Sequence, residues 1–173
     1  MGGAFRPTSG KVIAALFNIL SSASLTGGDF LDLFAGSGAA AVEALRRGAG
    51  KVVCVESDRA RAKAISERFG ASGFPAERAA CICSDVRRAI PRLGREETGR
   101  KFVVIFADPP YCMGWGKILP PLMAEHWRLV APGGVFVFER SSREIPADIF
   151  AARDDRIYGE TVLSFYWRKE DGT

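Results

Sequence analysis

The sequence is poor in the residues that most often build metal sites and catalytic triads. It has a single histidine, His126, and its four cysteines form no CxxC pair and no zinc-ligand spacing. Chemistry centred on histidine therefore has one candidate, and His126 falls in a predicted helix, where a structural histidine is the more common arrangement. We expect a protein that uses no metal.

Long apolar runs are also absent. No run approaches the roughly 18 residues that cross a bilayer, and the first residues, Met1 to Thr8, contain no apolar signal core. These absences predict a cytoplasmic protein without a membrane partner. A chain of 173 residues fits one domain, with an N-terminal lead-in and helix over 1–26 and a core over 27–173.

The charge is moderately basic. A net charge of +4 and a pI of about 9.0 permit a polyanionic partner without requiring one. The densest basic stretch, Arg87 to Lys101, has two interpretations. It either contacts phosphates or is a solvated helix end and loop.

Apolar runs alternate with helical patterns along the chain. Runs rich in β-branched and aromatic residues predict strands, and the segments between them show helical spacing. Such alternation is typical of a parallel sheet with helices on both faces. We predict an α/β, Rossmann-like doubly wound sheet, mostly parallel, with a C-terminal antiparallel hairpin strand. The expected strands are 29–34, 51–55, 79–83, 102–107, 135–138, 156–158 and 161–167, and the expected helices are 9–22, 39–47, 58–69, 86–93 and 118–130.

Prolines and glycines near the last of these helices refine the prediction. Pro120 and Pro121 are expected in its first turn, where proline is tolerated. The Pro-Gly-Gly run at 132–134 predicts a turn before the next strand.

A glycine loop follows the first predicted strand. Gly36-Ser37-Gly38 lies before a helix, and glycine lets the chain turn sharply and approach a ligand where a Cβ would clash. Free N–H groups at the start of that helix suit the polar atoms of a ligand. Counting Ala41, the run fits G-x-G-x-x-A, so the loop alone does not separate an NAD site from an S-adenosylmethionine site.

Acidic residues near the ends of three strands favour the second cofactor. Asp32 lies four residues before Gly36, and Glu56 ends the second strand at the spacing of an acid that binds ribose hydroxyls. Asp85 ends the third strand, where it could accept from an adenine amino group. Three negative charges suit a cationic sulfonium nucleoside better than an anionic dinucleotide. The alternative for each acid is a helix N-cap, and it is strongest for Asp85, which a helix follows directly.

The chain is organised around a stretch from Phe102 in which six apolar residues lead into Asp108-Pro109-Pro110-Tyr111. The apolar run predicts a strand buried on both faces. The prolines end it, because neither has an N–H to donate. The acid and the ring are then expected on stiff backbone at the carboxyl end of a central strand, where ligands bind in open α/β sheets. A rigid turn with an exposed ring is the alternative.

Together these motifs resemble a known enzyme family. Asp32-Leu-Phe-Ala-Gly-Ser-Gly38 followed by Asp108-Pro-Pro-Tyr111 resembles the class I S-adenosylmethionine-dependent amino-methyltransferases. More narrowly, the chain resembles the RsmD-like methyltransferases, which methylate the exocyclic N2 of a guanine in 16S ribosomal RNA. The segments that carry this narrower resemblance are Arg6-Pro-Thr8, Leu16-Phe-Asn-Ile-Leu20, Glu43-Ala-Leu45, Arg47-Gly-Ala49, Tyr158-Gly-Glu-Thr161 and Leu163-Ser-Phe-Tyr166.

The resemblance implies a fold, a cofactor, a partner and site residues. It implies the class I methyltransferase fold, S-adenosylmethionine as cofactor, and 16S ribosomal RNA as partner, within a 30S subunit or assembly intermediate; we expect a monomer. Catalysis is assigned to Asp108, Pro109, Pro110 and Tyr111, and substrate contacts to Arg6, Thr8 and Asn18. Glu56 is assigned to the ribose, and Asp85 with Val86 to the adenine. The resemblance implies that the cofactor-binding residues are Asp32, Phe34, Ala35, Gly36, Ser37, Gly38, Glu56, Ser57, Asp85, Val86 and Asp108.

The Asp-Pro-Pro-Tyr motif predicts how an exocyclic amine is methylated. Such an amine is a poor nucleophile because its lone pair is delocalised into the ring. If the Asp108 carboxylate and the Pro109 carbonyl accept its two N–H bonds, the lone pair points at the methyl group. Tyr111 then offers a face on which an unstacked base can lie.

Other functions share the same residues. DNA or RNA adenine-N6 and cytosine-N4 amino-methyltransferases use this motif, although a chain this short has little room for a target-recognition domain. Protein glutamine methyltransferases carry Asn where Asp108 stands. The non-enzymatic alternative is a nucleotide-binding, RNA-binding module without catalysis, against which the intact Asp108 and Tyr111 argue.

Overall fold

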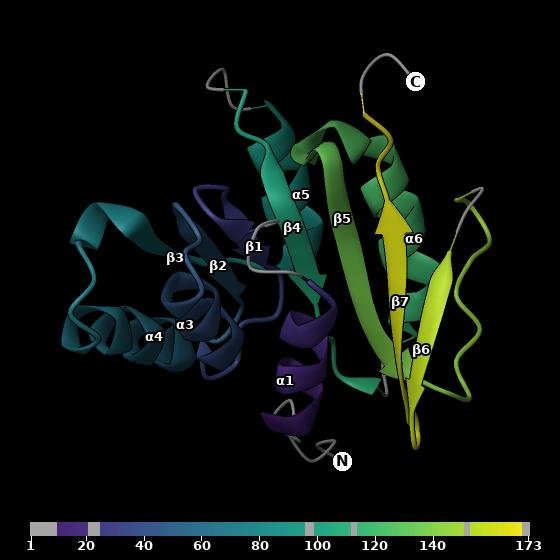
Figure 1. The fold of residues 1–173 in the computed structure, drawn as a ribbon, viewed down its shortest axis with the longest axis horizontal. Helices are drawn as coiled ribbons and strands as arrows, with labels where there is room; N and C mark the ends of the chain where they lie inside the picture. The colour runs from purple at the N-terminus through teal and green to yellow at the C-terminus, as the bar shows by residue number, and fades with distance from the viewer. Residues whose placement is uncertain (1–9, 21–24, 96–98, 112–113, 151–152, 171–173) are drawn as a thin grey trace.

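A seven-stranded sheet forms the centre of the structure, a computed structural model that describes residues 10–20, 25–95, 99–111, 114–150 and 153–170. The strand order is β3-β2-β1-β4-β5-β7-β6, and Figure 1 shows β3 at one end and β6 at the other. The strands are β1 (Phe30–Asp32), β2 (Val52–Glu56), β3 (Ala79–Cys83), β4 (Phe102–Ala107), β5 (Val130–Ser141), β6 (Asp154–Tyr158) and β7 (Thr161–Trp167).

The pairing of the strands confirms the predicted fold class. Strands β1 to β5 pair in parallel, β7 pairs antiparallel with β5, and β6 pairs antiparallel with β7. The last two strands are the predicted C-terminal hairpin. The chain therefore has the α/β, doubly wound architecture with an antiparallel end.

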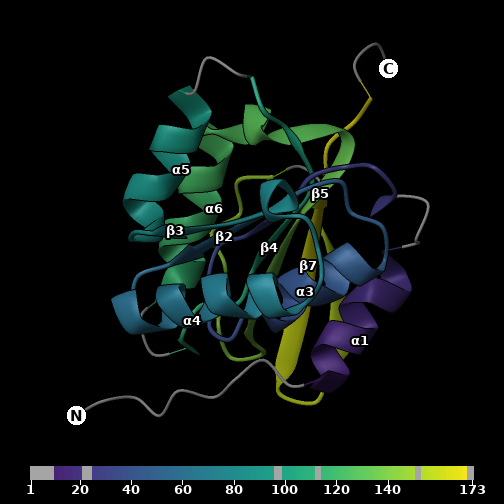
Figure 2. The same ribbon diagram turned by 90° about the vertical axis from the view of Figure 1, so that its left-hand side faces the viewer.

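Helices cover both faces of the sheet, as Figure 2 shows. One buried cluster joins the sheet to α1, α3 and α4, and a second joins its other face to α5 and α6. Burial on both faces explains why β4 and most of β2 consist of apolar residues without alternation. The helices are α1 (Gly10–Ile19), α3 (Ala39–Arg46), α4 (Arg59–Ala71), α5 (Val86–Arg95) and α6 (Trp115–Glu125), with short 3-10 helices η1 (Ala76–Arg78) and η3 (Trp127–Leu129).

The position of α6 corrects the prediction of a helix over 118–130. The helix begins earlier and ends earlier, so Pro120 and Pro121 lie inside it rather than in its first turn. Pro120 has no N–H for the Gly116 carbonyl, four residues before it, and that carbonyl instead accepts from the Ala147 N–H at 2.8 Å. The helix tolerates this proline because a neighbouring loop satisfies the freed carbonyl.

The Pro-Gly-Gly run at 132–134 also differs from the prediction, since it lies within β5 rather than in a turn. Gly133 has a φ of 70°, and its N–H donates to the Arg168 carbonyl at 3.1 Å. The Arg168 N–H donates to the Gly134 carbonyl at 2.8 Å. The register with β4 is irregular at this point. Proline and glycine here mark a bulge in a continuing strand, which their presence alone does not distinguish from a turn.

The strands at 79–83, 102–107 and 161–167 have the predicted bounds, and the other expected elements are present with shifted ends. Of the predicted first helix, residues 9, 21 and 22 lie outside the described residues. Strand β1 is shorter than predicted, so Asp32 is its last residue. Within the described ranges, no helix is both long and apolar enough to cross a membrane. The division into a lead-in over 1–26 and a core over 27–173 stays a prediction.

Candidate functional site

Four acidic residues gather where neighbouring parallel strands end. Asp32 ends β1, Glu56 ends β2 and Asp108 directly follows β4. Glu139 directly follows Phe138, the last residue of β5 that pairs with β4. Because β1 lies between β2 and β4, and β5 lies beside β4, these acids share one edge of the sheet. The structure thus brings together three of the predicted site residues.

The glycine loop between β1 and α3 has the backbone that its sequence predicts. Gly36 and Gly38 have φ values of 54° and 73°, a region that side chains with a Cβ rarely adopt. Gly38 is also the N-cap of α3 and provides no capping side chain. The first turn of α3 therefore keeps N–H groups that suit the polar atoms of a ligand.

The Glu56 carboxylate fastens this loop to the end of β2. Its Oε2 accepts from the Gly36 N–H at 3.0 Å, while its Oε1 accepts from the Asp58 N–H at 2.8 Å and from Arg61 Nη2 at 3.1 Å. The side chain is buried. Glu56 therefore shapes the loop, and the ribose contact expected of it stays a prediction.

Asp32 is a buried acid beside the loop. Asp32 is 1% exposed, and among the described residues its Oδ1 has no hydrogen-bond partner. Burial raises the pKa of Asp32 to about 7; the hydrogen bond from the Phe34 N–H opposes this rise, and the charges of Asp108 and Glu56 add to it. A cationic ligand group at Asp32 would satisfy the unpartnered oxygen and favour the ionised acid.

Asp85 caps helix α5 and pairs with an arginine. Its Oδ1 accepts from the Arg87 N–H at 2.8 Å, and its Oδ2 accepts from Arg87 Nη2 at 2.7 Å. The hydrogen bond from the guanidinium lowers the pKa of Asp85. The Asp85 carboxylate therefore acts as a helix N-cap, which is the alternative that the sequence also offered. The side chain of Val86 is buried in the core. Contact of these two residues with an adenine stays a prediction.

The Asp108-Pro109-Pro110-Tyr111 segment leaves the sheet at the carboxyl end of β4, where the sequence predicts it. Asp108 is partly buried, Pro109 is buried and Pro110 is exposed. Asp108 lies close enough to Asp32 for its charge to raise the pKa of that acid. Because β4 pairs with β1, the motif and the glycine loop lie at the same edge of the sheet.

Tyr111 is held at its hydroxyl while much of its ring stays accessible. The hydroxyl donates to Glu139 Oε1 at 3.2 Å and lies 3.2 Å from Thr161 Oγ1. Burial of the hydroxyl raises the pKa of Tyr111 to about 12, so it stays protonated at neutral pH. The residue is 41% exposed, which leaves ring surface for a ligand.

Glu139 and Thr161 were not predicted from the sequence. Glu139 carried a usable signal, because it follows the apolar run Val135 to Phe138 as Asp108 follows the run of β4. No pattern in the sequence indicates that Thr161 lies at the site. Its place beside Tyr111 depends on the antiparallel pairing of β5 with β7.

The remaining loop residues predicted to bind the cofactor lie between β1 and α3, and their contact with a cofactor stays a prediction. The Phe34 ring packs edge-on against Trp115, with ring centroids 4.9 Å apart, and Ala35 is buried. The Ser37 carbonyl accepts from Arg68 Nη1 at 3.1 Å. These contacts fix the loop from both faces of the sheet.

The other predicted residues are less closely tied to the site. Ser57 is exposed directly after Glu56, and its hydroxyl lies 3.5 Å from the Glu56 carboxylate. Asn18 is exposed on α1. Arg6 and Thr8 lie outside the described residues. A substrate role for these last three stays a prediction.

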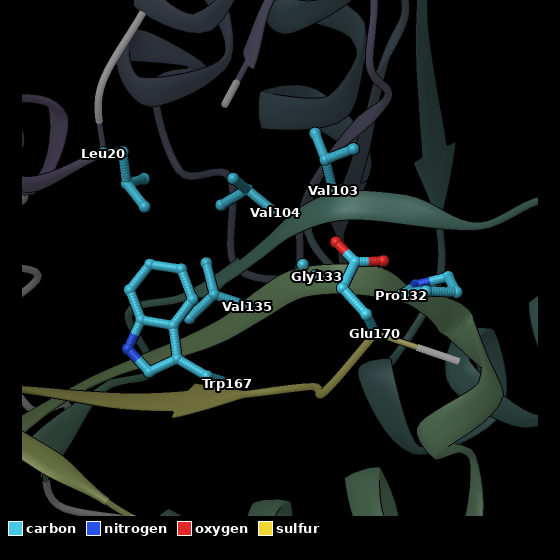
Figure 3. A pocket seen from close by; sticks show the side chains of 9 residues that line it. Leu20, Val103, Val104, Pro132, Gly133, Val135, Trp167 and Glu170 are labelled. Carbon is cyan, nitrogen blue, oxygen red and sulfur yellow. The ribbon is translucent and has the colours of Figure 1, made fainter. Parts of the chain in front are cut away.

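A separate open cavity of about 190 Å³ lies at the opposite, amino edge of the parallel strands. Figure 3 shows it bordered by Val103 and Val104 at the start of β4, by Trp167 and by Glu170. It is not part of the acidic site, because Asp108 follows the other end of β4. Within the described ranges, no group of three His, Cys, Asp or Glu side chains is arranged to hold a metal ion.

Comparison with known proteins decides the family. The model of the family described as Conserved hypothetical protein 95 matches residues 1–167. YlbH of Bacillus subtilis, named as a candidate rRNA methyltransferase, is 31% identical over 171 residues, which cover 97% of this chain and 90% of YlbH. The chain belongs to this RsmD-like family.

One further relative and one solved structure are also similar to this chain. Ribosomal RNA small subunit methyltransferase D of Escherichia coli K12 is 26% identical over 170 residues, covering 96% of this chain and 81% of that protein. RsmC of Thermus thermophilus, a 16S rRNA N2 guanine methyltransferase solved with AdoMet and guanosine, superposes with a TM-score of 0.74 at 26% identity. That match covers 96% of this chain and 44% of RsmC.

Proposed function

We propose that this chain transfers a methyl group from S-adenosylmethionine to the exocyclic N2 amine of a guanine in 16S ribosomal RNA. The observation that carries the proposal is the placement of Asp108 and Pro109 beside Asp32 and the glycine loop, at the ends of the adjacent strands β4 and β1. One edge of the sheet thus offers an acidic site for a cationic cofactor and acceptors for an amine. RNA methylation is also what the names of its relatives describe.

The residues at this edge fit S-adenosylmethionine. The unpartnered Oδ1 of Asp32 would accept from the ligand ammonium, and the loop at 36–38 would lie against its methionine part. Glu56 would accept from ribose hydroxyls, and Asp85 with the Val86 N–H would face the adenine. Bound there, the cofactor supplies a methyl group made electrophilic by its sulfonium.

Asp108 and Pro109 would activate the substrate amine by orientation. The Asp108 carboxylate and the Pro109 carbonyl accept the two N–H bonds, which directs the nitrogen lone pair towards the methyl group. Asp108 would then receive the proton that the nitrogen loses as an N–C bond replaces the S–C bond of the donated methyl group. The two prolines restrict the backbone, which keeps the carbonyl from turning away.

Tyr111 would hold the target base after it leaves its stack. Its hydroxyl is anchored and its ring is accessible, so a base can lie on the ring. Stacking on an aromatic side chain is worth about 1–3 kcal/mol per base. This energy offsets part of the cost of unstacking the base.

The proposed substrate is 16S RNA within a 30S subunit or an assembly intermediate, and the chain would act on it in the cytoplasm as a monomer. The net charge of +4 suits a phosphate-rich partner.

Labelled methyl transfer tests the proposal. The chain is incubated with labelled cofactor and with 30S particles or free 16S RNA that lack the modification, and the RNA is digested to nucleosides. We expect label in N2-methylguanosine. Label in N6-methyladenosine or N4-methylcytidine would support the alternative amino-methyltransferases, and no label in any nucleoside would contradict RNA methylation.

A further inference from the structure

The turn between β6 and β7 brings a second tyrosine close to the anchor of Tyr111. Tyr158, the last residue of β6, is paired directly with Thr161, the first residue of β7. Residues directly opposite each other in an antiparallel pair project to the same face, with Cβ atoms about 4.5–5.5 Å apart. Since Thr161 Oγ1 lies 3.2 Å from the Tyr111 hydroxyl, both tyrosines have Thr161 as a neighbour.

Glu139 lies on the same face of the sheet. It pairs with Leu163, which is two residues from Thr161 along β7 and therefore projects to the same side. Leu163 belongs to the buried cluster that includes α1, which identifies the face. The Tyr111 hydroxyl thus joins the loop after β4 to both β5 and β7.

Both rings are accessible to a large partner. Tyr111 and Tyr158 are each 41% exposed, beside a site whose proposed substrate is a nucleobase. RNA-binding proteins recognise unstacked bases by stacking them on such aromatic rings. Ile157, the neighbour of Tyr158 on β6, projects to the opposite face and is 70% exposed, so it provides a matched control on the same strand.

We propose that Tyr158 is a second base-stacking residue of the RNA site, for a nucleotide flanking the target guanine, and that Thr161 and Glu139 are positioning residues that fix the Tyr111 ring. The proposal rests on the proposed function, because it takes RNA as the partner. It adds the end of the β6–β7 hairpin to the substrate site.

RNA affinity tests the role of Tyr158. Binding of unmodified 16S RNA is measured for the wild type, Tyr158→Ala, Tyr158→Phe and Ile157→Ala, with cofactor affinity measured on the same preparations. We expect Tyr158→Ala to weaken RNA binding about 5- to 150-fold, the range that loss of one stacked base gives. Tyr158→Phe and Ile157→Ala should stay within about twofold, and cofactor affinity should not change. Equal RNA affinity of Tyr158→Ala and wild type, or an equal loss in Ile157→Ala, would overturn the role.

Steady-state kinetics test the positioning residues. Thr161→Val removes the hydroxyl and keeps the shape, and it should lower kcat for RNA about 5- to 20-fold without changing KM for the cofactor, a loss expected of one misplaced hydrogen-bonded group. Thr161→Ser should restore the rate. Glu139→Gln should likewise lower kcat. Tyr111→Phe combined with Thr161→Val should lose no more than Tyr111→Phe alone, because both remove the same contact. Additive losses, or a wild-type rate in Thr161→Val, would contradict positioning.

The two proposals fail in different ways. A wild-type chain that methylates no RNA contradicts the proposed function. A wild-type chain that methylates RNA normally, while Tyr158→Ala and Thr161→Val match it in binding and rate, contradicts only the role of the hairpin.

Discussion

The backbone N–H of Gly36 donates to the carboxylate of Glu56 at 3.0 Å, so the loop after β1 is fastened to the end of β2. This contact joins the two strands whose ends would hold opposite parts of a nucleoside cofactor. It also means that a change at Glu56 acts on the shape of the loop as well as on any ligand contact.

Substitution of Glu56 is expected to damage both stability and cofactor binding. Glu56→Ala leaves three buried or partly buried donors without their acceptor, so the free energy of unfolding should fall by about 2–3 kcal/mol. Cofactor affinity should fall at least about tenfold, which is about 1.4 kcal/mol. Denaturant unfolding and titration calorimetry measure the two effects. As a control, Glu67→Ala breaks only an exposed ion pair with Lys63 and should change stability by less than about 0.5 kcal/mol. Unaltered cofactor affinity in Glu56→Ala would contradict the role of the loop.

Cofactor affinity should rise with pH through the titration of Asp32. The pKa of Asp32 is about 7 in the free chain, and a bound ammonium group would lower it because the two charges attract. Binding below pH 7 should therefore release a proton, and the dissociation constant should decrease as pH rises from about 6 to 8. Calorimetry in buffers of different ionisation enthalpy counts this proton. Asp32→Asn should bind weakly without that pH dependence, and a wild-type affinity independent of pH would count against the assignment.

The same residue should make the free chain less stable as pH rises. The folded-state pKa of Asp32, about 7, is above the ordinary value of 3.8, so between these values the folded chain binds a proton that the unfolded chain has lost. The contribution of Asp32 to stability therefore decreases as pH rises through this window, by at most about 4 kcal/mol. Asp32→Asn should remove this decrease in urea unfolding followed from pH 4 to 8. If the wild type and Asp32→Asn show the same pH dependence of the unfolding free energy, the pKa of Asp32 is not raised.

Arg140 is expected to stabilise the antiparallel end of the sheet. It is buried, with Nε donating to Ser164 Oγ at 3.0 Å, Nη1 to the Glu144 carbonyl at 2.7 Å and Nη2 to Asp155 Oδ2 at 2.8 Å. Arg140→Leu should cost about 2–3 kcal/mol of unfolding free energy, because it removes the hydrogen-bond donor of the Glu144 carbonyl and of Asp155 Oδ2, while Asp155 keeps its ion pair with Arg153 at 3.2 Å. Arg143→Ala, which breaks an exposed ion pair with Glu160, should cost less than about 1 kcal/mol. Equal melting temperatures of the two variants would show that the buried network contributes little.

The sequence predicted the strand–helix alternation and most of the site because those features are local. Buried strands in a parallel sheet read as continuous apolar runs, and the glycine loop and the Asp108 motif are contiguous segments. An acid directly after a strand can be placed at the sheet edge without knowledge of the fold. For this reason Asp32, Glu56 and Asp108 were found together.

Features that depend on distant segments were missed. The prolines of α6 are tolerated because the Ala147 N–H serves a carbonyl that Pro120 cannot, and that partner is remote in sequence. Thr161 reaches Tyr111 only through strand pairing. Pairing register and side-chain partners, rather than element identity, were therefore beyond sequence reasoning.

Asp108 is expected to act chiefly on the substrate amine, although the family resemblance also counts it among the cofactor-binding residues. The most direct measurement is single-turnover methyl transfer to unmodified 16S RNA by wild type and Asp108→Ala, with cofactor affinity determined on the same samples. Loss of the proton acceptor should slow transfer by about 100- to 10,000-fold, while the dissociation constant for the cofactor stays within a few-fold. A transfer rate in Asp108→Ala within about tenfold of the wild-type rate would contradict the account.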